Sequence, residues 1–214
     1  MTPSQINTIA RQRYNAVGDT FWSDQEIYDL IYHACMELAN EALIIERVFT
    51  TTTVASQQEY DYPGYALAIK RVTYNGRKLV PITFREDDVL TVLNQAMTST
   101  GTPTSYAFWN NVFYLRPIPS SAQTLKVWAY VEPQAIAVTS TLEIPTEYHM
   151  ALVNYILAEM CSKNKNYQGA EYYLTKWGQD VARIKRTERK KQRGDAFQVV
   201  KNVDIIPQTD LGNV

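Results

Sequence analysis

The sequence predicts an α+β protein in which an antiparallel helical bundle forms the core and a β-rich segment is inserted into it. Three observations support this fold class: apolar residues recur at helical spacing near both ends, β-branched and aromatic residues with turn formers fill the middle, and 214 residues suffice for a substantial core. We expect 1–47 and 141–193 to form the bundle, 48–140 the β-rich insertion, and 194–214 an extended C-terminal arm.

The first two helices are predicted from their start signals. Thr2 is placed to cap a helix that has Pro3 at its first position and runs to about Asn15. The segment Ser23–Glu26 is a capping box, in which a serine and a glutamate three residues later satisfy free backbone N–H groups. The helix that follows buries one apolar stripe and is expected to run to about Arg47.

The middle of the chain contains hairpin signals. Asn75-Gly76 and Asn110-Asn111 each separate two strand-like runs, and these residue types tolerate the positive φ angles of two-residue hairpin turns. A further strand is predicted over 125–131, where apolar and polar residues alternate. The acidic opening turn of 86–95 favours a short helix there.

Two more helices are predicted near the C-terminus. One begins near Pro145 and is apolar around much of its girth, which places it in the middle of a bundle. The last helix has a narrower stripe, in which we expect Leu174 and Trp177 to be buried against Leu30, Leu152 and Ile156. Gly194 ends this pattern.

The sequence offers no catalytic constellation. The only two histidines, His33 and His149, are not accompanied by metal-binding spacings, and the acidic run at 86–88 is explained by the dipole of a helix start. Glycine-rich phosphate loops and a serine nucleophile elbow are absent from the sequence. We therefore expect no enzyme activity, no catalytic or metal-binding residues and no cofactor.

Other features concern compartment and partners. Cys35 and Cys161 lie in apolar helical stretches without a signal peptide before them, which favours a reducing compartment. Apolar runs are too short for a membrane span. The fifteen tyrosines favour extensive interfaces, because tyrosine combines a large apolar body with a polar tip.

The end of the last helix is strongly basic, with seven cations in eleven positions between 183 and 193. One interpretation is a solvated helix end whose cations suit the negative end of the helix dipole. The other is a surface that docks on an acidic protein or lies beside DNA by non-specific contact. The sequence leaves both interpretations open.

Three stretches together resemble the head-to-tail adaptor (connector) proteins of tailed bacteriophages. They are Gly101-Thr102-Pro103 with Tyr106, 112–119 and 125–130; Ile144-Pro145-Thr146-Glu147-Tyr148-His149 leading into the apolar helix; and the last helix with its basic, extended tail. The resemblance covers most of the chain and is carried by structural residues.

The resemblance implies a structural virion protein that assembles as a ring, commonly of twelve copies, in the neck of the particle. The ring would bind the portal protein at the capsid vertex and a downstream tail or nozzle protein, and double-stranded DNA would pass through it. Assembly would take place in the host cytoplasm. The expected portal-docking arm comprises Arg183, Lys185, Arg186, Arg189, Lys190, Lys191, Arg193, Phe197, Val199 and Val200, and the expected tail-facing or subunit contacts are Tyr106, Trp109 and Tyr114.

Two alternative functions remain open at this point. A tail-associated carbohydrate-binding module would use Phe108, Trp109 and Tyr114 as a sugar platform. A cell-wall hydrolase would need paired acidic residues in a cleft. Glycan binding would identify the first, and turnover abolished by one carboxylate substitution would identify the second.

Overall fold

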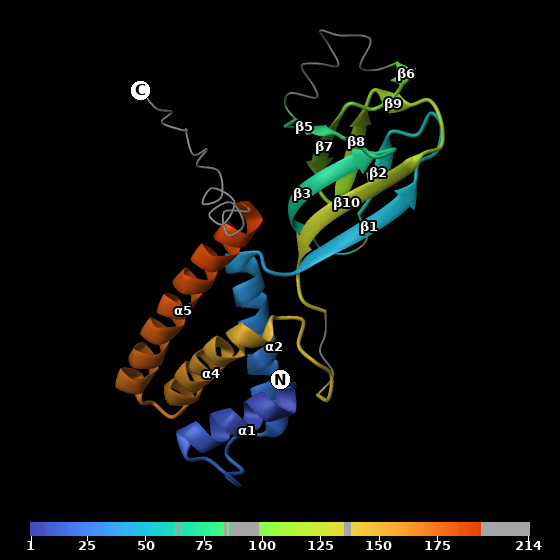
Figure 1. Cartoon of the computed structure of the whole chain (residues 1–214). Helices are drawn as coiled ribbons and strands as arrows, with labels where there is room; N and C mark the ends of the chain where they lie inside the picture. The colour runs from blue at the N-terminus through green and yellow to red at the C-terminus, as the bar shows by residue number, and fades with distance from the viewer. Residues whose placement is uncertain (63, 65, 84, 86–98, 135–137, 194–214) are drawn as a thin grey trace, which may run out of the picture. The chain divides into compact units, whose positions relative to one another are not determined.

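The chain folds into two compact units (Figure 1). The computed structural model describes residues 1–62, 64, 66–83, 85, 99–134 and 138–193. One unit combines Met1–Ala42 with Ile136–Val214, and the other is Leu43–Ala135. We call them the helical unit and the β unit, and each is described by itself.

The described part of the helical unit contains four α-helices. They are α1 (Pro3–Tyr14), α2 (Asp24–Ala42), α4 (His149–Lys163) and α5 (Tyr167–Arg193), with a short 3₁₀ turn, η2 (Thr146–Tyr148), before α4. The Thr2 side chain caps α1 and forms a capping box with Gln5. The backbone N–H of Glu26 donates to Ser23 Oγ at 3.1 Å, so the predicted starts of both helices are confirmed.

The core of the helical unit lies around α4, which packs against α1, α2 and α5. Leu152, Ile156 and Leu157 of α4 are fully buried, because this helix is apolar on several sides. Trp177 of α5 is half-buried and its ring contacts that of Tyr155 at a centroid distance of 5.3 Å. Leu174, however, is 46% exposed, so the prediction that it packs in the core is wrong.

The β unit contains two four-stranded sheets and a two-stranded one. The first sheet has the order β1-β10-β3-β4, formed by Glu46–Thr52, Thr124–Val131, Ala66–Tyr74 and Arg77–Lys78. The second has the order β2-β8-β7-β5, formed by Glu59–Asp61, Val112–Arg116, Ser105–Trp109 and Val80–Pro81. The small sheet pairs β6 (Thr100–Gly101) with β9 (Ile118–Pro119).

The two larger sheets form separate layers (Figure 1) whose inner faces meet in an apolar core. Phe113 of β8 is fully buried, and its ring contacts that of Tyr62 at 6.2 Å. Tyr62 in turn contacts Phe49 of β1 at 5.8 Å, which links the second sheet to the first. The β unit therefore has an interior of its own.

The prediction that an antiparallel helical bundle forms the core is wrong. The chain is α+β, with four helices and three sheets in its described part, and the sheets supply much of the buried interior. The physical reason is that the strand-rich segment closes two sheets over their own apolar side chains, as sheets with one apolar face must. The strand-rich segment therefore has a core of its own and does not depend on the helices to bury its apolar side chains.

Local strand predictions fared better. Asn75-Gly76 connects β3 to β4 and Asn110-Asn111 connects β7 to β8, so both hairpins are confirmed. All four turn residues have positive φ angles, from 47° to 78°. The predicted strand at 125–131 is confirmed as β10. The short helix expected over 86–95 lies outside the described residues.

The second helix is shorter than predicted. It ends at Ala42, where Leu43 adopts a positive φ of 51°, and the chain enters β1 at Glu46. Arg47, which we expected at the helix end, is instead paired with Ala129 in the first sheet. The pairing of β1 with β10 along seven residues outweighs the helical periodicity of the preceding segment.

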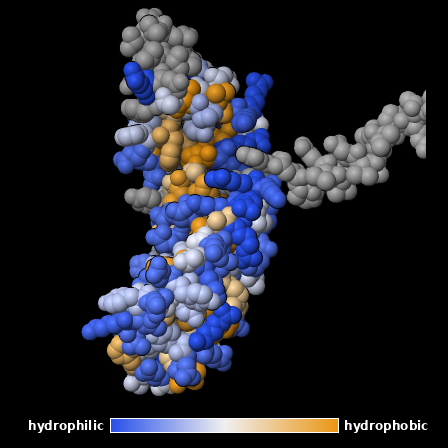
Figure 2. Space-filling view, turned by 90° about the vertical axis from the view of Figure 1, so that its left-hand side faces the viewer, coloured by the Kyte–Doolittle hydropathy of each residue, from blue (hydrophilic) through white to orange (hydrophobic). Residues whose placement is uncertain are grey.

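The surface is mixed in character. On the face drawn in Figure 2, hydrophilic residues cover most of the helical unit, and apolar residues reach the surface of the β unit. Within the described ranges, none of the helices combines the length and hydropathy that crossing a bilayer requires.

Candidate interaction surfaces

The two histidines lie in different environments, and only His149 is held by buried hydrogen bonds. His149 is fully buried; its Nδ1 accepts a hydrogen bond from the Met1 ammonium at 2.8 Å, and its Nε2–H donates to the Ile144 carbonyl at 2.7 Å. Burial is the main cause that lowers the pKa of His149. His33 is exposed on α2, and Glu86, Asp87 and Asp88 lie outside the described residues.

The cysteines also have a structural environment. Cys35 and Cys161 are both free thiols and both buried in the helical unit. Burial raises the pKa of Cys35 to about 12 and also raises the pKa of Cys161. Groups of three or more metal-ligating side chains do not occur among the residues with described positions.

The cations at the basic end of α5 fall into two groups, those that form ion pairs within the protein and those that face solvent. Three of the predicted docking residues form ion pairs within the helical unit: Arg183 with Asp180 at 2.9 Å, Lys185 with Glu41 of α2, and Lys191 with Glu147 and Glu188 at 2.8 Å each. The charge of these three is thus partly neutralised by the protein itself.

Lys191 belongs to a compact cluster at the end of α5. The buried Tyr148 donates its hydroxyl to Glu188 at 2.5 Å, and Lys191 lies 5.4 Å from the centre of the Tyr148 ring. Burial and the Glu188 carboxylate raise the pKa of Tyr148, and the Glu147 and Glu188 carboxylates raise that of Lys191. This cluster ties α5 to the start of α4.

The remaining described cations of this segment face solvent. Arg186, Arg189 and Lys190 are exposed and have no ion-pair partner among the residues that the structure places. Val181 and Ile184 are buried on the opposite side of the helix, so the 3.6-residue period turns Arg186 and Lys190 outward. We call Arg186, Arg189 and Lys190 the outward basic face.

The other predicted arm residues are only partly described. Arg193 is the last residue of α5, whereas Phe197, Val199 and Val200 lie outside the described residues. Sequence reasoning listed the seven cations as one cluster because the acidic partners Glu41 and Glu147 are distant in the chain.

The predicted contact residues of the β unit fall into two environments. Tyr106 is buried, and its ring contacts Phe113 at 5.8 Å, so it contributes to the interior of the unit. Trp109 and Tyr114 are on the outer face of the second sheet, with Trp109 62% exposed and Tyr114 half-buried. These two can contact a partner.

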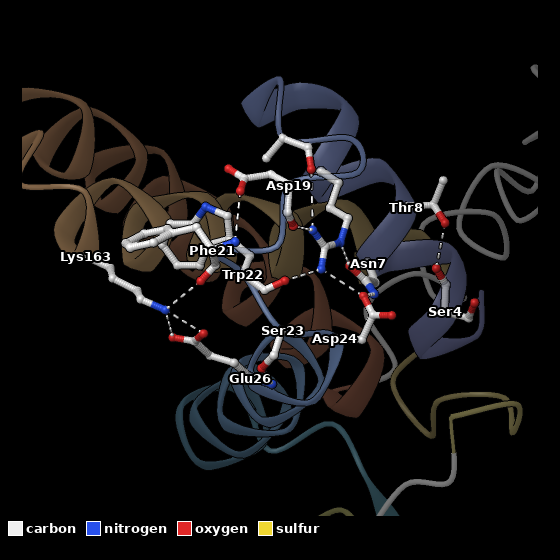
Figure 3. A network of polar contacts seen from close by, with 12 residues as sticks. Ser4, Asn7, Thr8, Asp19, Phe21, Trp22, Ser23, Asp24, Glu26 and Lys163 are labelled. Carbon is white, nitrogen blue, oxygen red and sulfur yellow. Dashed lines mark hydrogen bonds and ion pairs between the residues drawn. The ribbon is translucent and has the colours of Figure 1, made fainter.

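A further surface, the connection between α1 and α2, was not predicted. Arg11 of α1 donates to the Trp22 carbonyl at 2.6 Å, to the Asp19 carbonyl at 3.0 Å and to Asp24 at 2.8 Å (Figure 3). The clamped connection presents two apolar side chains, Val17 and Phe21, which are 73% and 54% exposed. Because the loop is clamped, it holds these two exposed side chains in place, where they can contact a partner.

The same connection is held from α4. Lys163 contacts the Glu26 carboxylate at 2.6 Å and the Phe21 carbonyl at 3.3 Å (Figure 3), and its ammonium lies about equally close to the Phe21 and Trp22 rings, at 4.6 and 4.5 Å. A sequence signal did exist, since two aromatic residues precede the capping serine, but the distant lysine could not be inferred from it.

The surfaces described above have features of a protein that works through contacts with partners, and comparison with known proteins agrees. A family model described as SU10 adaptor protein matches residues 1–202. A search of the curated proteins found no match. Because the family model covers nearly the whole chain, the protein belongs to the SU10 adaptor protein family, whose members are structural adaptor proteins of bacteriophage virions.

Proposed function

We propose that this adaptor forms a ring of twelve copies in the neck of the virion. In this proposal the ring joins the portal protein at the capsid vertex to the next tail component, and DNA leaves the capsid through its channel. Membership of the adaptor family supports the head-to-tail role. The ring and the portal contact are the parts that the experiments below test.

The observation that carries the portal contact is the outward basic face of α5. Arg186, Arg189 and Lys190 present three charges on about one turn and a half of helix, and no carboxylate of the described chain neutralises them. Cations held without partners are available for an acidic surface, where charge-assisted hydrogen bonds are stronger than neutral ones. We propose that this face docks on an acidic surface of the portal.

The chain beyond α5 extends the proposed docking region. Residues 194–214 follow the outward basic face directly and include the apolar alternation of Phe197 and Val199. We propose that this segment adds a strand to the portal, because backbone hydrogen bonds then supply affinity while the cations supply orientation. The internally paired cations Lys185 and Lys191 would hold α5 on its own unit.

The test is a charge reversal of the outward basic face with a matched control. Replacing Arg186, Arg189 and Lys190 by glutamate should strongly reduce attachment of the purified protein to DNA-filled heads that carry the portal. The loss should be greatest at low ionic strength, where the wild-type charges are least screened. Co-sedimentation with heads and electron microscopy of the particles measure attachment.

The control carries the same change in net charge at three other exposed cations of the helical unit, Arg13, Lys165 and Lys176. It should attach to heads as well as the wild-type protein does. Equal attachment by both triple variants would contradict the proposed role of α5. Particles in which averaged images show a symmetry other than twelvefold would correct the copy number.

A further inference from the structure

The β unit carries opposite charges on its two outer faces. We infer that these faces bind each other between neighbouring copies, so that the cationic face of one β unit receives the acidic face of the next. This inference rests on the ring in the proposed function and names the contact that builds it.

The cationic face is the outer surface of the first sheet, and we define it by Arg71, Lys78, Lys126 and Trp128. Its members are brought together by strand pairing: Arg71 lies opposite Trp128, and Thr73 lies between Lys126 and Lys78. The Arg71 guanidinium is 5.2 Å from the Trp128 ring centre, which holds it over the sheet.

This face is hollowed and lacks counter-charges. A concavity of about 440 Å³ is lined by Arg71, Thr73, Asn75, Gly76, Thr124, Lys126 and Trp128. Among the residues that the structure places, none of the three cations of this face forms an ion pair. The one acidic side chain of the outer row of β1, Glu46, is already bonded to Lys70 at 2.5 Å. The face therefore offers charge to a partner.

The acidic face is the outer surface of the second sheet, and we define it by Glu59, Asp61, Trp109 and Tyr114. Tyr60 points into the core, so strand alternation turns its neighbours Glu59 and Asp61 outward, where both are exposed. Glu59 lies opposite Tyr114, and Val112 separates Asp61 from Trp109. Neither carboxylate makes an ion pair within the described part of the chain.

The two faces match in spacing as well as in charge. Glu59 and Asp61 are two residues apart on one strand, which separates their attachment points by about 7 Å. Arg71 and Lys126 are diagonal neighbours on adjacent strands, a separation of roughly 7–8 Å. Both carboxylates can thus meet both cations at once, while the aromatic rings Trp109 and Trp128 supply apolar area on either side.

The position of the faces determines the kind of assembly. They are on opposite outer sides of a two-layer unit, because the inner sides of its sheets share the core that contains Phe113. A contact between unlike faces is heterologous and closes into a ring when the rotation per copy permits. A two-fold dimer would place like charges together, which is unfavourable.

The experiment uses two reversed variants of the full chain. Arg71→Glu with Lys126→Glu makes both faces acidic, and Glu59→Lys with Asp61→Lys makes both faces basic. Each variant alone should assemble at least about tenfold less than the wild-type protein, since every contact then pairs like charges. An equimolar mixture should restore assembly, because alternating copies have complementary faces at every contact.

Mass photometry and electron microscopy measure assembly, and circular dichroism checks that each variant is folded. Wild-type assembly by either variant alone, failure of the mixture to assemble, or a wild-type protein that stays monomeric under all conditions would overturn the inference. Loss of duplex DNA binding in the Arg71→Glu, Lys126→Glu variant with unchanged assembly would assign the cationic face to nucleic acid instead. Head attachment is scored separately, so rings that form but do not bind heads would contradict the adaptor proposal and leave the subunit contact standing.

Discussion

Replacing Arg11 by methionine should destabilise the helical unit by about 3 kcal/mol, because one guanidinium organises the whole connection between α1 and α2. Its side chain is only 14% exposed. It donates to Asn7, Asp24 and the carbonyls of residues 16, 19 and 22, at distances from 2.6 to 3.4 Å. Methionine keeps much of the aliphatic stem but donates none of these bonds.

The magnitude follows from which acceptors lose access to a donor. The bonds to Asn7 and to the Trp22 carbonyl are partly buried, and a hydrogen bond from a charged donor contributes roughly 1.5–3 kcal/mol in such settings. The pair with Asp24 is worth less than about 1 kcal/mol, because Asp24 is 64% exposed and water screens it. Exposed carbonyls such as that of Asp19 can bond to water instead.

Urea unfolding followed by circular dichroism at the helical wavelengths measures the effect. The matched control is Gln12→Met on the same helix, an exposed position where the change should stay within about 0.5 kcal/mol. Arg11→Lys should recover little of the loss, since one ammonium cannot reach the several acceptors spread over the connection as the guanidinium fork does. A loss for Arg11→Met no larger than that for Gln12→Met would refute the assignment of the connection's order to this residue.

The same cluster predicts a pH dependence. Hydrogen bonds from Asn7 and then from Arg11 hold the pKa of Asp24 below its ordinary value. A depressed carboxylate pKa stabilises the folded state above the unfolded pKa of about 4, and this contribution is lost as the pH falls through the folded value. The stability difference between the wild-type protein and Asp24→Asn should therefore be present at neutral pH and shrink in acid; a difference that grows below about pH 4 would contradict this.

Two further predictions concern the interior of the helical unit. Leu152→Ala should lower the free energy of unfolding by about 2–5 kcal/mol, because Leu152 is fully buried. Leu174→Ala, at a 46% exposed position, should lower it by less than about 1 kcal/mol. Equal losses for the two variants in thermal or urea unfolding would contradict the observed packing of α5. The thiols of Cys35 and Cys161 are buried and have raised pKa values, so neither should react with a thiol reagent at pH 8 in the native protein. Both should react in urea. Rapid labelling of the native protein would contradict their burial.

Sequence reasoning succeeded where the cause of a structure is local. The Asn75-Gly76 and Asn110-Asn111 turns were predictable because each needs residues that accept positive φ, and these types are written in the sequence itself. The capping residues Thr2 and Ser23 were predictable for the same reason, since their partners are three residues away.

The failures have long-range causes. Helical periodicity placed Leu174 on the apolar stripe of the last helix. It could not show that the neighbouring helices leave this side chain 46% exposed. The choice between a helical core and a sheet-rich interior depends on how much surface each layer buries, which the order of elements does not contain. Strands β5 and β7 pair in parallel through two residues each, and so short a pairing has no recognisable pattern.

For the candidate surfaces, the sequence showed where the cations cluster but not which of them form ion pairs within the protein and which face solvent. The cluster of seven cations divides into paired and outward-facing groups only when Glu41 of α2 and Glu147 of η2 are brought to α5. In the β unit, the opposite charges of the two outer faces follow from strand register. A register is a property of two segments at once, so single-segment reasoning missed it.

The division of the chain gives the protein a fixed order of events on the ribosome. The helical unit takes α1 and α2 from the start of the chain and α4 and α5 from its end, with all of Leu43–Ala135 between them. During synthesis the β unit is complete before α4 emerges, so it can fold first. Until α4 and α5 emerge, only α1 is available to cover the apolar stripe of α2, which includes Ile27, Ile31 and Leu38. Nascent chains paused within the β unit should therefore expose part of the apolar stripe of α2, and chaperones that shield such stripes should matter most before α4 has been translated.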